Sequence, residues 1–266
     1  MTFVFRAAVV GAGTMGGEIA HAIASAGIPV LLQDVDREAA ERAAGAAGDA
    51  SGLITPVTDY DGFGDVDFVV EAVPEQLPLK QEVFAALDEV TPGGAILASN
   101  TSSLSISEIG AVTLRPDQVV GFHFFFPVST NRLVEVTEGE DTTTETVQTA
   151  VTFAQAIRRV AIRCVEAPGF VVNRVLNAAV SELWRAQEEA GIAVAEVDRI
   201  VGAASASGLG PFYIADLLGL DTVVAVAEYL QASFGDRFYV HQGMRALVQE
   251  GHRGAKTGQG FYEHPG

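Results

Sequence analysis

The chain has 266 residues, 48% hydrophobic and 19% charged, which excludes a disordered protein and can support a sizeable core. Acidic residues outnumber basic ones 34 to 16, and the resulting net charge of −18 repels nucleic acid and anionic lipid. The single cysteine excludes an internal disulfide, and no apolar run reaches the roughly 18 residues that a membrane helix needs. No signal peptide is recognisable either. We therefore expect a cytoplasmic protein that binds neither membranes nor nucleic acid.

The N-terminal half alternates short, apolar, partly β-branched segments with alanine-rich ones. The expected buried strands are Val4–Val10, Pro29–Asp34, Asp67–Val73, Ala95–Ser99 and Val119–Phe125. Helices are expected between them at Gly16–Ala26 and Leu79–Val90. Strands that alternate with helices in this way predict βαβ units and a mostly parallel sheet.

From about Glu145 onward the pattern is almost wholly helical. Thr142 and Glu145 have capping-box spacing before an apolar series, and only Val160–Val165 then resembles a strand. Further on, an apolar stripe at helical spacing comprises Val175, Leu176, Ala179, Val180, Leu183 and Trp184, and another apolar helix is expected at about Thr222–Leu230. We therefore expect an α/β domain over residues 1–167 and an all-α domain over residues 168–266.

A glycine-rich segment joins the first expected strand to the first expected helix, in the order Gly11, Ala12, Gly13, Thr14, Met15, Gly16. Such glycines permit a tight turn, backbone approach to a pyrophosphate and close packing of helix on strand, while the helix N-terminus offers N–H groups. Asp34 ends the second strand, where an acid binds ribose hydroxyls and repels a 2′-phosphate. The pattern predicts a Rossmann-type domain that binds NAD, although Arg37 leaves NADP open. The alternative is a glycine turn in an unrelated α/β protein.

Further motifs occur in one order along the chain: Ala12–Gly16, Glu71–Glu75, Ser99–Ser103, His123–Phe125, Leu133–Val136, Pro168–Arg174 and Lys256–Tyr262. With these motifs, the chain resembles the L-3-hydroxyacyl-CoA dehydrogenase family, including bacterial 3-hydroxybutyryl-CoA dehydrogenases. The resemblance runs from about residue 5 to residue 262, and Gly210–Phe212 and Asp216–Asp221 match the family's helical domain.

The resemblance implies reversible hydride transfer between NAD and the C3 carbinol of a 3-hydroxyacyl thioester, a small-molecule substrate of fatty acid metabolism, by a homodimer. The family's catalytic His–Glu pair falls on His123 and Glu135, and its contacts to the reacting oxygen or thioester fall on Ser102 and Asn173. Its cofactor contacts fall on Gly11, Gly13, Thr14, Met15, Gly16, Asp34, Glu75, Lys80 and Asn100.

The His–Glu pair also makes chemical sense. Hydride leaves a carbinol carbon easily only if the hydroxyl proton is removed, and histidine titrates near neutrality. His123 and Glu135 lie symmetrically about Ser129, so an antiparallel hairpin of Gly121–Phe125 with Leu133–Thr137 would place them opposite each other. The alternatives are a satisfied core histidine and a surface acid on an edge strand.

Other candidates also have simpler interpretations. Ser102 or Ser103 could be a helix N-cap, Asn173 could make a local bond to the backbone, and Lys80 could be solvated on its helix. The remaining histidines lack the spacing of metal ligands, so we expect no metal; they are His21, His241, His252 and His264.

Three positions depart from the family. Phe126 follows His-Phe-Phe where asparagine is usual, and Glu18 replaces a glycine near the phosphate site, where it is harmless if it turns to solvent. Asp36–Thr55 is short, and its only basic residues are Arg37 and Arg42, whereas relatives insert longer helices whose basic residues help to bind CoA. We therefore expect a weak dependence on the CoA nucleotide.

Two other hypotheses stay open. A member of this family could act on a carrier-protein-bound or small free hydroxy acid, or the chain could be a non-catalytic NAD-binding protein. Retention of all four candidate catalytic residues argues against the latter. The apolar surfaces of the C-terminal half, including Phe212–Leu220, are larger than a domain of about 100 residues readily hides, which favours a homodimer built from residues 168–266.

Overall fold

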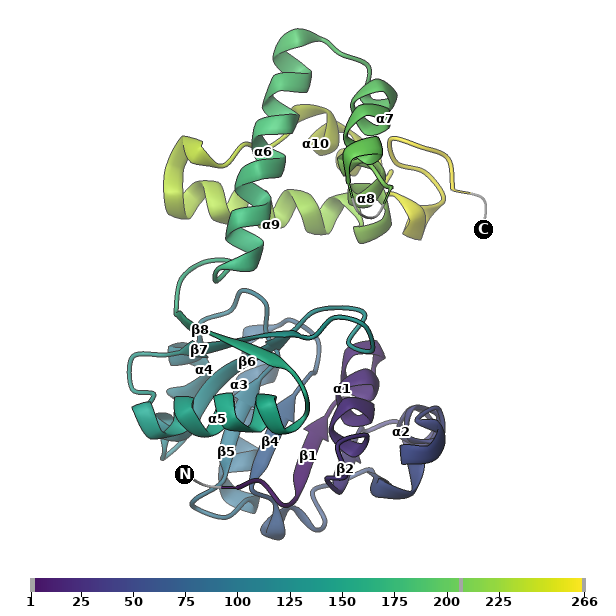
Figure 1. Ribbon diagram of the computed structural model, residues 1–266. Helices are drawn as coiled ribbons and strands as arrows, with labels where there is room; N and C mark the ends of the chain where they lie inside the picture. Colours follow the sequence, from purple (N-terminus) through teal and green to yellow (C-terminus); the bar gives the residue numbers. More distant parts are fainter. Residues whose placement is uncertain (1–2, 206–207, 265–266) are drawn as a thin grey trace. The chain divides into compact units, whose positions relative to one another are not determined.

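The computed structural model describes residues 3–205 and 208–264. The chain divides into two compact units, Met1–Phe170 and Val171–Gly266, three residues beyond the boundary expected before Pro168. Figure 1 shows that the first unit contains the sheet and that the second is built from helices. Among the described residues, no helix has both the length and the apolar character needed to span a membrane.

Within the described residues, eight strands form one sheet in the order β3-β2-β1-β4-β5-β6-β7-β8. They are β1 Ala7–Val10, β2 Val30–Gln33, β3 Ile54–Val57, β4 Phe68–Glu71, β5 Ile96–Ser99, β6 Val119–Phe124, β7 Leu133–Glu138 and β8 Val160–Val165. All neighbours are parallel except β6 and β7, which are antiparallel. The mostly parallel sheet is confirmed. Each expected strand is present, with bounds equal to the prediction or up to three residues shorter, except that β7 extends one residue beyond the expected Leu133–Thr137.

Strand β3 was not expected from the sequence. It pairs only with β2, at the edge of the sheet, and it contains Pro56, which has no N–H to donate to a ladder. Ile54 is its one buried residue, so the segment shows neither the apolar run nor the alternation that identifies a strand.

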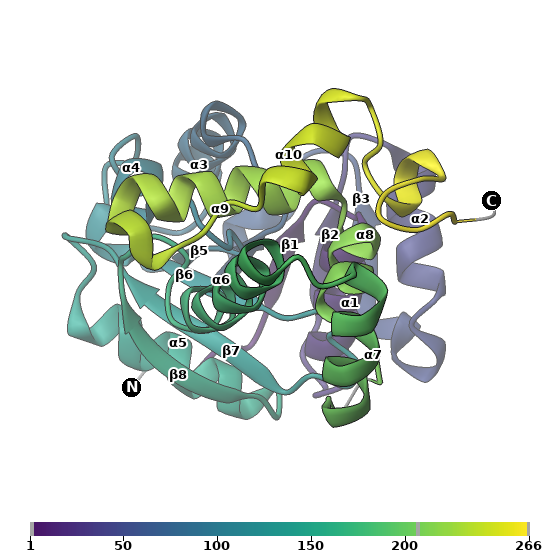
Figure 2. The same cartoon turned by 90° about the horizontal axis from the view of Figure 1, so that it is seen from above.

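Helices cover both faces of the sheet. They are α1 Thr14–Ala24, α2 Arg37–Gly45, α3 Leu77–Val90, α4 Ile106–Gly110 and α5 Thr144–Ala156, with short 3₁₀ turns at Gly48–Leu53, Phe63–Asp65 and Pro116–Gln118. Ile19 of α1 and Phe153 of α5 share one core layer, whereas Phe84 of α3 and Ile109 of α4 belong to the other. Figure 2 shows α3 and α4 across the sheet from α5.

The cap of α5 lies one residue beyond the expected one. Thr143 is the N-cap, and its side chain accepts a hydrogen bond from Thr146 N. Thr142 instead donates its hydroxyl to Val119 O and accepts from Gly139 N, so it joins the preceding turn to β6.

The second unit contains α6 Val172–Ala190, α7 Val194–Ala204, α8 Pro211–Leu218, α9 Leu220–Phe234 and α10 Gln242–Gln249, with 3₁₀ turns at Gly235–Arg237 and Ala255–Thr257. Trp184, Phe212, Leu220 and Met244 form the centre of its own core. The expected all-α domain is confirmed in the described residues, and the expected apolar helix at Thr222–Leu230 is the central part of α9.

Two carboxylates, a partly buried one at Asp198 and a fully buried one at Asp216, hold this helical unit together. Asp198 accepts hydrogen bonds from the backbone N–H groups of Phe212 and Tyr213, at the start of α8. Asp216 accepts from the N–H groups of Phe261 and Tyr262, in the C-terminal segment. Gly210 lies against Asp198 and Gly260 against Asp216 so closely that a Cβ would clash with them. The C-terminal motifs are therefore explained by packing.

Candidate functional site

The glycine loop connects β1 to the N-terminus of α1. Gly11 has φ +98°, and a Cβ there would collide with the backbone of Ala72, while a Cβ at Gly16 would collide with the Gly11 carbonyl. Around Gly13, by contrast, no atom lies within 4 Å of where a Cβ would be. Gly13 is the N-cap and has no side chain to accept the first N–H groups of the helix, so these groups have no side-chain cap and can bind an anion such as a phosphate.

Asp34 lies directly after β2 and against this loop. Its Oδ2 accepts a hydrogen bond from Ala12 N at 2.7 Å, and its Oδ1 accepts from Asp36 N at 2.9 Å. The carboxylate is therefore fixed beside the glycine loop, where a dinucleotide ribose would lie. Arg37 forms an exposed ion pair with Glu41 at 3.6 Å.

A second group of residues gathers where β4 and β5 end. Lys80 of α3 is 1% exposed, and its Nζ donates to Glu71 Oε1 at 2.8 Å and to Val73 O at 3.2 Å. Nζ also lies 3.3 Å from Glu75 Oε2. The interpretation of Lys80 as a solvated helix residue is therefore wrong.

Glu71 was not singled out from the sequence as a functional residue. It is fully buried at the end of β4, where Oε1 accepts from Lys80 and Oε2 accepts the Ser99 hydroxyl at 2.6 Å. An acid that ends an apolar strand is the available signal, because a buried carboxylate needs a cation and hydrogen-bond donors.

Glu75 connects Lys80 to the hydroxyl cluster after β5. Its Oε1 accepts the Thr101 hydroxyl at 2.6 Å and Ser102 N at 2.9 Å, and Ser102 Oγ lies 3.4 Å away. Burial raises the pKa of Glu75, but the positive charge of Lys80 and these hydrogen bonds outweigh it, so the pKa is lowered. The helix after the cluster is capped by Ser105, so the N-cap interpretation of Ser102 or Ser103 is wrong.

Asn100 joins this cluster to the strand that carries the histidine. Its Oδ1 accepts a hydrogen bond from Phe124 N at 2.9 Å, which ties the end of β5 to β6 one residue beyond His123. The structure therefore brings Glu75, Lys80, Asn100 and Ser102 together around neighbouring strand ends of the first unit.

The hairpin that would pair His123 with Glu135 is confirmed. The two residues are directly opposite in the antiparallel β6–β7 ladder, and His123 Nδ1 lies 2.8 Å from Glu135 Oε2. Glu135 is fully buried and His123 is 7% exposed. Because β8 covers the other side of β7, the interpretation of Glu135 as a surface acid on an edge strand is wrong.

The tautomer of His123 follows from its partner. A carboxylate only accepts hydrogen bonds, so Nδ1 carries the hydrogen that faces Glu135, and in the neutral ring Nε2 retains the lone pair. The ring packs against Phe125 and Phe170, with centroids 4.4 and 6.1 Å away. A neutral histidine oriented in this way can accept a proton through Nε2.

Two of the departures from the family lie beside the strand of His123. Glu18 Oε2 accepts hydrogen bonds from Val128 N at 2.5 Å and Ser129 N at 3.3 Å, so its side chain holds the loop after β6 and does not turn to solvent. Phe126 at the start of this loop is 60% exposed.

Asn173 lies in the first turn of α6, as expected, and belongs to the second unit. Its backbone carbonyl accepts a hydrogen bond from Asn177 Nδ2 at 2.8 Å. Over residues 3–205 and 208–264, no group of three or more His, Cys, Asp or Glu side chains is arranged to hold a metal ion.

Comparison with known proteins agrees with this geometry. Residues 6–53 and 44–167 match the 3-hydroxyacyl-CoA dehydrogenase NAD-binding domain, and residues 169–264 match the C-terminal domain of the same family. The two ranges of the first match overlap at residues 44–53, within Asp36–Thr55, the segment identified above as short.

A 3-hydroxybutyryl-CoA dehydrogenase of Clostridioides difficile is 34% identical over 97% of this chain and 99% of its own. The crystal structure of (S)-3-hydroxybutyryl-CoA dehydrogenase from Ralstonia eutropha is 32% identical, with TM-score 0.92 over 99% of this chain and 100% of that one. A solved diketoreductase, described as acting on dicarbonyl compounds, is 29% identical, with TM-score 0.82 over 99% of this chain and 100% of its own. The chain therefore belongs to the 3-hydroxyacyl-CoA dehydrogenase family and is an oxidoreductase whose N-terminal domain binds NAD.

Proposed function

We propose that this enzyme interconverts a 3-hydroxyacyl-CoA thioester, similar to 3-hydroxybutyryl-CoA, and its 3-oxoacyl form. The observation that carries the proposal is the placement of His123 and Glu135 directly opposite each other on β6 and β7, with Nδ1 2.8 Å from Oε2, in a chain of the 3-hydroxyacyl-CoA dehydrogenase family. Relatives about one-third identical to this chain over their full length are 3-hydroxybutyryl-CoA dehydrogenases, which supports the substrate class.

NAD supplies the hydride acceptor when it is bound. In the oxidising direction, Nε2 of His123 takes the proton of the C3 hydroxyl, and Glu135 keeps the ring in the required tautomer and stabilises the imidazolium that forms. In the reducing direction, the same imidazolium returns the proton to the carbonyl oxygen. We assign Ser102 and Asn173 to contacts with the reacting oxygen or the thioester carbonyl.

The cofactor contacts are assigned in the same way. Gly11, Gly13, Thr14, Met15 and Gly16 surround the open N-terminus of α1 and are assigned to the pyrophosphate. Asp34 is assigned to the ribose hydroxyls, and Glu75, Lys80 and Asn100 to the nicotinamide half of the site. Lys80 acts there through Glu75, because Nζ is already engaged by two carboxylates.

The second candidate function is action on a small free hydroxy or oxo acid, which the diketoreductase relative favours. An NADH absorbance assay separates the two candidates when 3-hydroxybutyryl-CoA is compared with free 3-hydroxybutyrate and with a carrier-protein-bound 3-hydroxybutyryl group. We expect the thioesters to be oxidised and the free acid to be a poor substrate. Turnover of the free acid alone would contradict the proposal, and the variant His123→Ala provides the blank for each substrate.

We also propose a homodimer formed through residues 168–266. The helical unit exposes large apolar side chains on α6 and α8, namely Val175 (59%), Leu176 (57%), Leu217 (49%) and Leu218 (65%). Light scattering at micromolar concentration should give twice the mass of the chain. A monomeric mass would contradict this assignment, and Leu176→Glu with Leu218→Glu should shift a true dimer to the monomer.

A further inference from the structure

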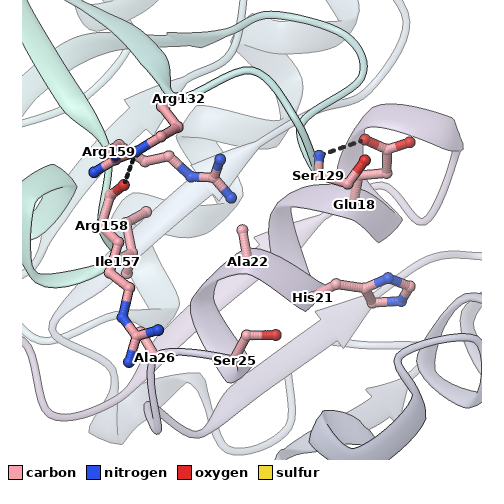
Figure 3. Close-up of a pocket in the computed structure, with 10 residues that line it drawn as sticks. All are labelled: Glu18, His21, Ala22, Ser25, Ala26, Ser129, Arg132, Ile157, Arg158 and Arg159. Carbon is pink, nitrogen blue, oxygen red and sulfur yellow. Dashed lines mark hydrogen bonds between the residues drawn. The ribbon is translucent and has the colours of Figure 1, made fainter.

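The first unit contains a pocket of about 380 Å³ that the catalytic assignment does not use. It lies between α1, the loop after β6 and the turn from α5 into β8. Figure 3 shows its arginines, Arg132, Arg158 and Arg159, on one side and the α1 residues Ala22 and Ser25 on the other.

The charge of this pocket is unusual for the chain. In a protein of net charge −18, three arginines and a single carboxylate, that of Glu18, line one pocket. Among the described residues, no carboxylate lies within salt-bridge distance of any of the three, whereas Arg37 and Arg42 are paired with acids on their own helix. The two basic residues of the short Asp36–Thr55 segment are therefore paired with acids, whereas the three arginines of the pocket are not.

Arg158 occupies a backbone position that favours glycine. Its φ is +60°, and α5 ends there in a Schellman motif, in which Arg158 N bonds Gln155 O and Arg159 N bonds Ala154 O. Glycine is usual at this position because it adopts positive φ without steric strain. An arginine at a strained position is expected when its guanidinium has a use.

Arg159 also lacks a full set of partners. Its Nη1 donates to Val128 O at 2.7 Å and to Asn131 O at 2.9 Å, but its buried Nε has no hydrogen-bond partner. Burial and the positive charge of Arg132 lower the pKa of Arg159, and only Glu18 opposes them. Because arginine stays protonated in proteins, the pocket holds excess positive charge that an anion would neutralise.

The pocket is close to the His–Glu pair along the chain. Arg132 precedes Glu135 by three residues, so their Cα atoms are at most about 11 Å apart, the length of fully extended chain. The loop that lines the pocket is the connection between β6 and β7, which carry His123 and Glu135. The ring of His123 packs against Phe170 of the core layer of α3 and α4, whereas Ile157 of the pocket belongs to the layer of α1 and α5. A ligand arm that joins the two sites therefore has to pass round the end of the sheet at this loop.

We propose that this pocket binds the phosphate groups of the nucleotide end of a CoA thioester substrate. The planar guanidinium of arginine matches phosphate oxygens in pairs, and three of them at one site suit a multiply charged ligand. The inference rests on the proposed function, and it replaces the expectation that the short Asp36–Thr55 segment leaves the CoA nucleotide without a site.

The test compares 3-hydroxybutyryl-CoA with its pantetheine thioester, which lacks the nucleotide. The variants are Arg158→Gly, which also relieves the backbone strain, and Arg132→Gln. Arg163→Gln is the matched control, because Arg163 lies on β8 outside the pocket, half exposed and paired with Glu138. Steady-state KM and kcat are measured for each variant at low and moderate salt.

We expect the wild-type enzyme to prefer the CoA ester at least about a hundredfold in kcat/KM. Each pocket variant should raise KM for the CoA ester about tenfold, the usual loss for one charge-assisted hydrogen bond, with kcat nearly unchanged. KM for the pantetheine ester and all values for Arg163→Gln should stay within about twofold. Arg158→Gly should also melt at a higher temperature, since glycine fits its backbone conformation.

Unchanged KM for the CoA ester in both pocket variants, or an equal rise for both thioesters, would overturn this inference while the dehydrogenase activity stands. If neither thioester is oxidised, the proposed function fails, and calorimetric titration with adenosine 3′,5′-bisphosphate decides the pocket separately. Binding that Arg158→Gly weakens about tenfold and Arg163→Gln does not would retain a nucleotide phosphate site. Inorganic phosphate that binds equally tightly would reduce the pocket to a simple anion site and overturn the CoA assignment.

Discussion

Each unit of this protein contains a buried carboxylate bonded to a histidine, and the two pairs have nearly the same length. His123 and Glu135 are 2.8 Å apart in the NAD-binding unit, and His264 and Asp216 are 2.9 Å apart in the helical unit. A short, buried His–carboxylate bond is therefore not by itself evidence of catalysis. The pairs differ in the other groups that each carboxylate bonds and in the element that holds each ring.

Asp216 is occupied by backbone groups. It accepts the N–H groups of Phe261 and Tyr262, so its charge holds the C-terminal segment on α8, and His264 is a third donor. Glu135 faces its histidine from β7, which lies between β6 and the edge strand β8, and the pairing of β6 with β7 fixes the ring. The first arrangement serves stability and the second leaves a histidine positioned to exchange a proton.

The largest expected effect separates the two histidines. His123→Ala should lower kcat about 10²–10⁴-fold, the usual contribution of a general acid–base group, while NADH affinity barely changes. His264→Ala should leave kcat within about twofold, because it removes one of several donors to a structural carboxylate. NADH absorbance kinetics and fluorescence titration measure both. Near-wild-type turnover in His123→Ala would contradict the assignment of proton transfer to His123.

Substitution of the two carboxylates should affect stability in the reverse order, with Asp216 the more important of the two. Asp216→Asn places an amide N–H₂ against N–H donors and should cost about 3 kcal/mol of unfolding free energy. Glu135→Gln should cost less than about 1.5 kcal/mol, because a neutral histidine can still bond an amide oxygen, but it should slow turnover at least about tenfold by disturbing the tautomer. Urea unfolding and steady-state kinetics on the same preparations provide the comparison. Equal destabilisation by the two substitutions would contradict it.

Local pattern was sufficient to predict that His123 and Glu135 face each other, whereas the family resemblance assigned their proposed role. The symmetric spacing of His123 and Glu135 about Ser129 predicts their register once the two segments form a hairpin, and the structure has this register. The glycine loop and its helix were predictable for the same reason, since strand, turn and helix follow one another along the chain.

Features that depend on packing of distant segments were not predictable. The burial of Lys80 requires Glu71 and Glu75 to converge on it from β4 and the loop that follows. Glu18 holds a loop 110 residues further along the chain, and no pattern in either segment predicts this contact. The arginine pocket likewise combines Arg132 with Arg158 and Arg159, which only the fold places together.

Asp34 is a carboxylate with a structural and a functional role. It fixes the glycine loop through Ala12 N, and it is assigned to the ribose hydroxyls of the cofactor. Asp34→Ala should weaken NAD binding about tenfold, because it removes one hydrogen bond to a charged group. It should also reduce the preference for NAD over NADP. Asp34→Asn keeps the shape, loses the charge and should improve NADP relative to NAD. Kinetic constants for both cofactors measure this, and a wild-type enzyme that uses NADP as well as NAD would refute the assignment.

The smallest expected effect concerns a carboxylate that serves the helical unit alone. Glu188 accepts the Tyr239 hydroxyl at 2.5 Å and the N–H groups of Gln242 and Gly243 at the start of α10. The hydrogen bond to Glu188, with burial, raises the pKa of Tyr239 to about 12, against about 10 in an unfolded chain. The bond therefore stabilises the fold fully below pH 10, and this contribution is lost as the pH rises from about 10 to about 12.

Tyr239→Phe should cost about 1 kcal/mol of unfolding free energy at pH 8 and should show a shallower loss of stability between pH 10 and pH 12. Urea unfolding at pH 8 and pH 11 tests both parts, with Tyr229→Phe on the exposed side of α9 as the control. Because Glu188 takes no part in the proposed chemistry, kcat at pH 8 should not change, and a kinetic effect would mean that this carboxylate is not purely structural.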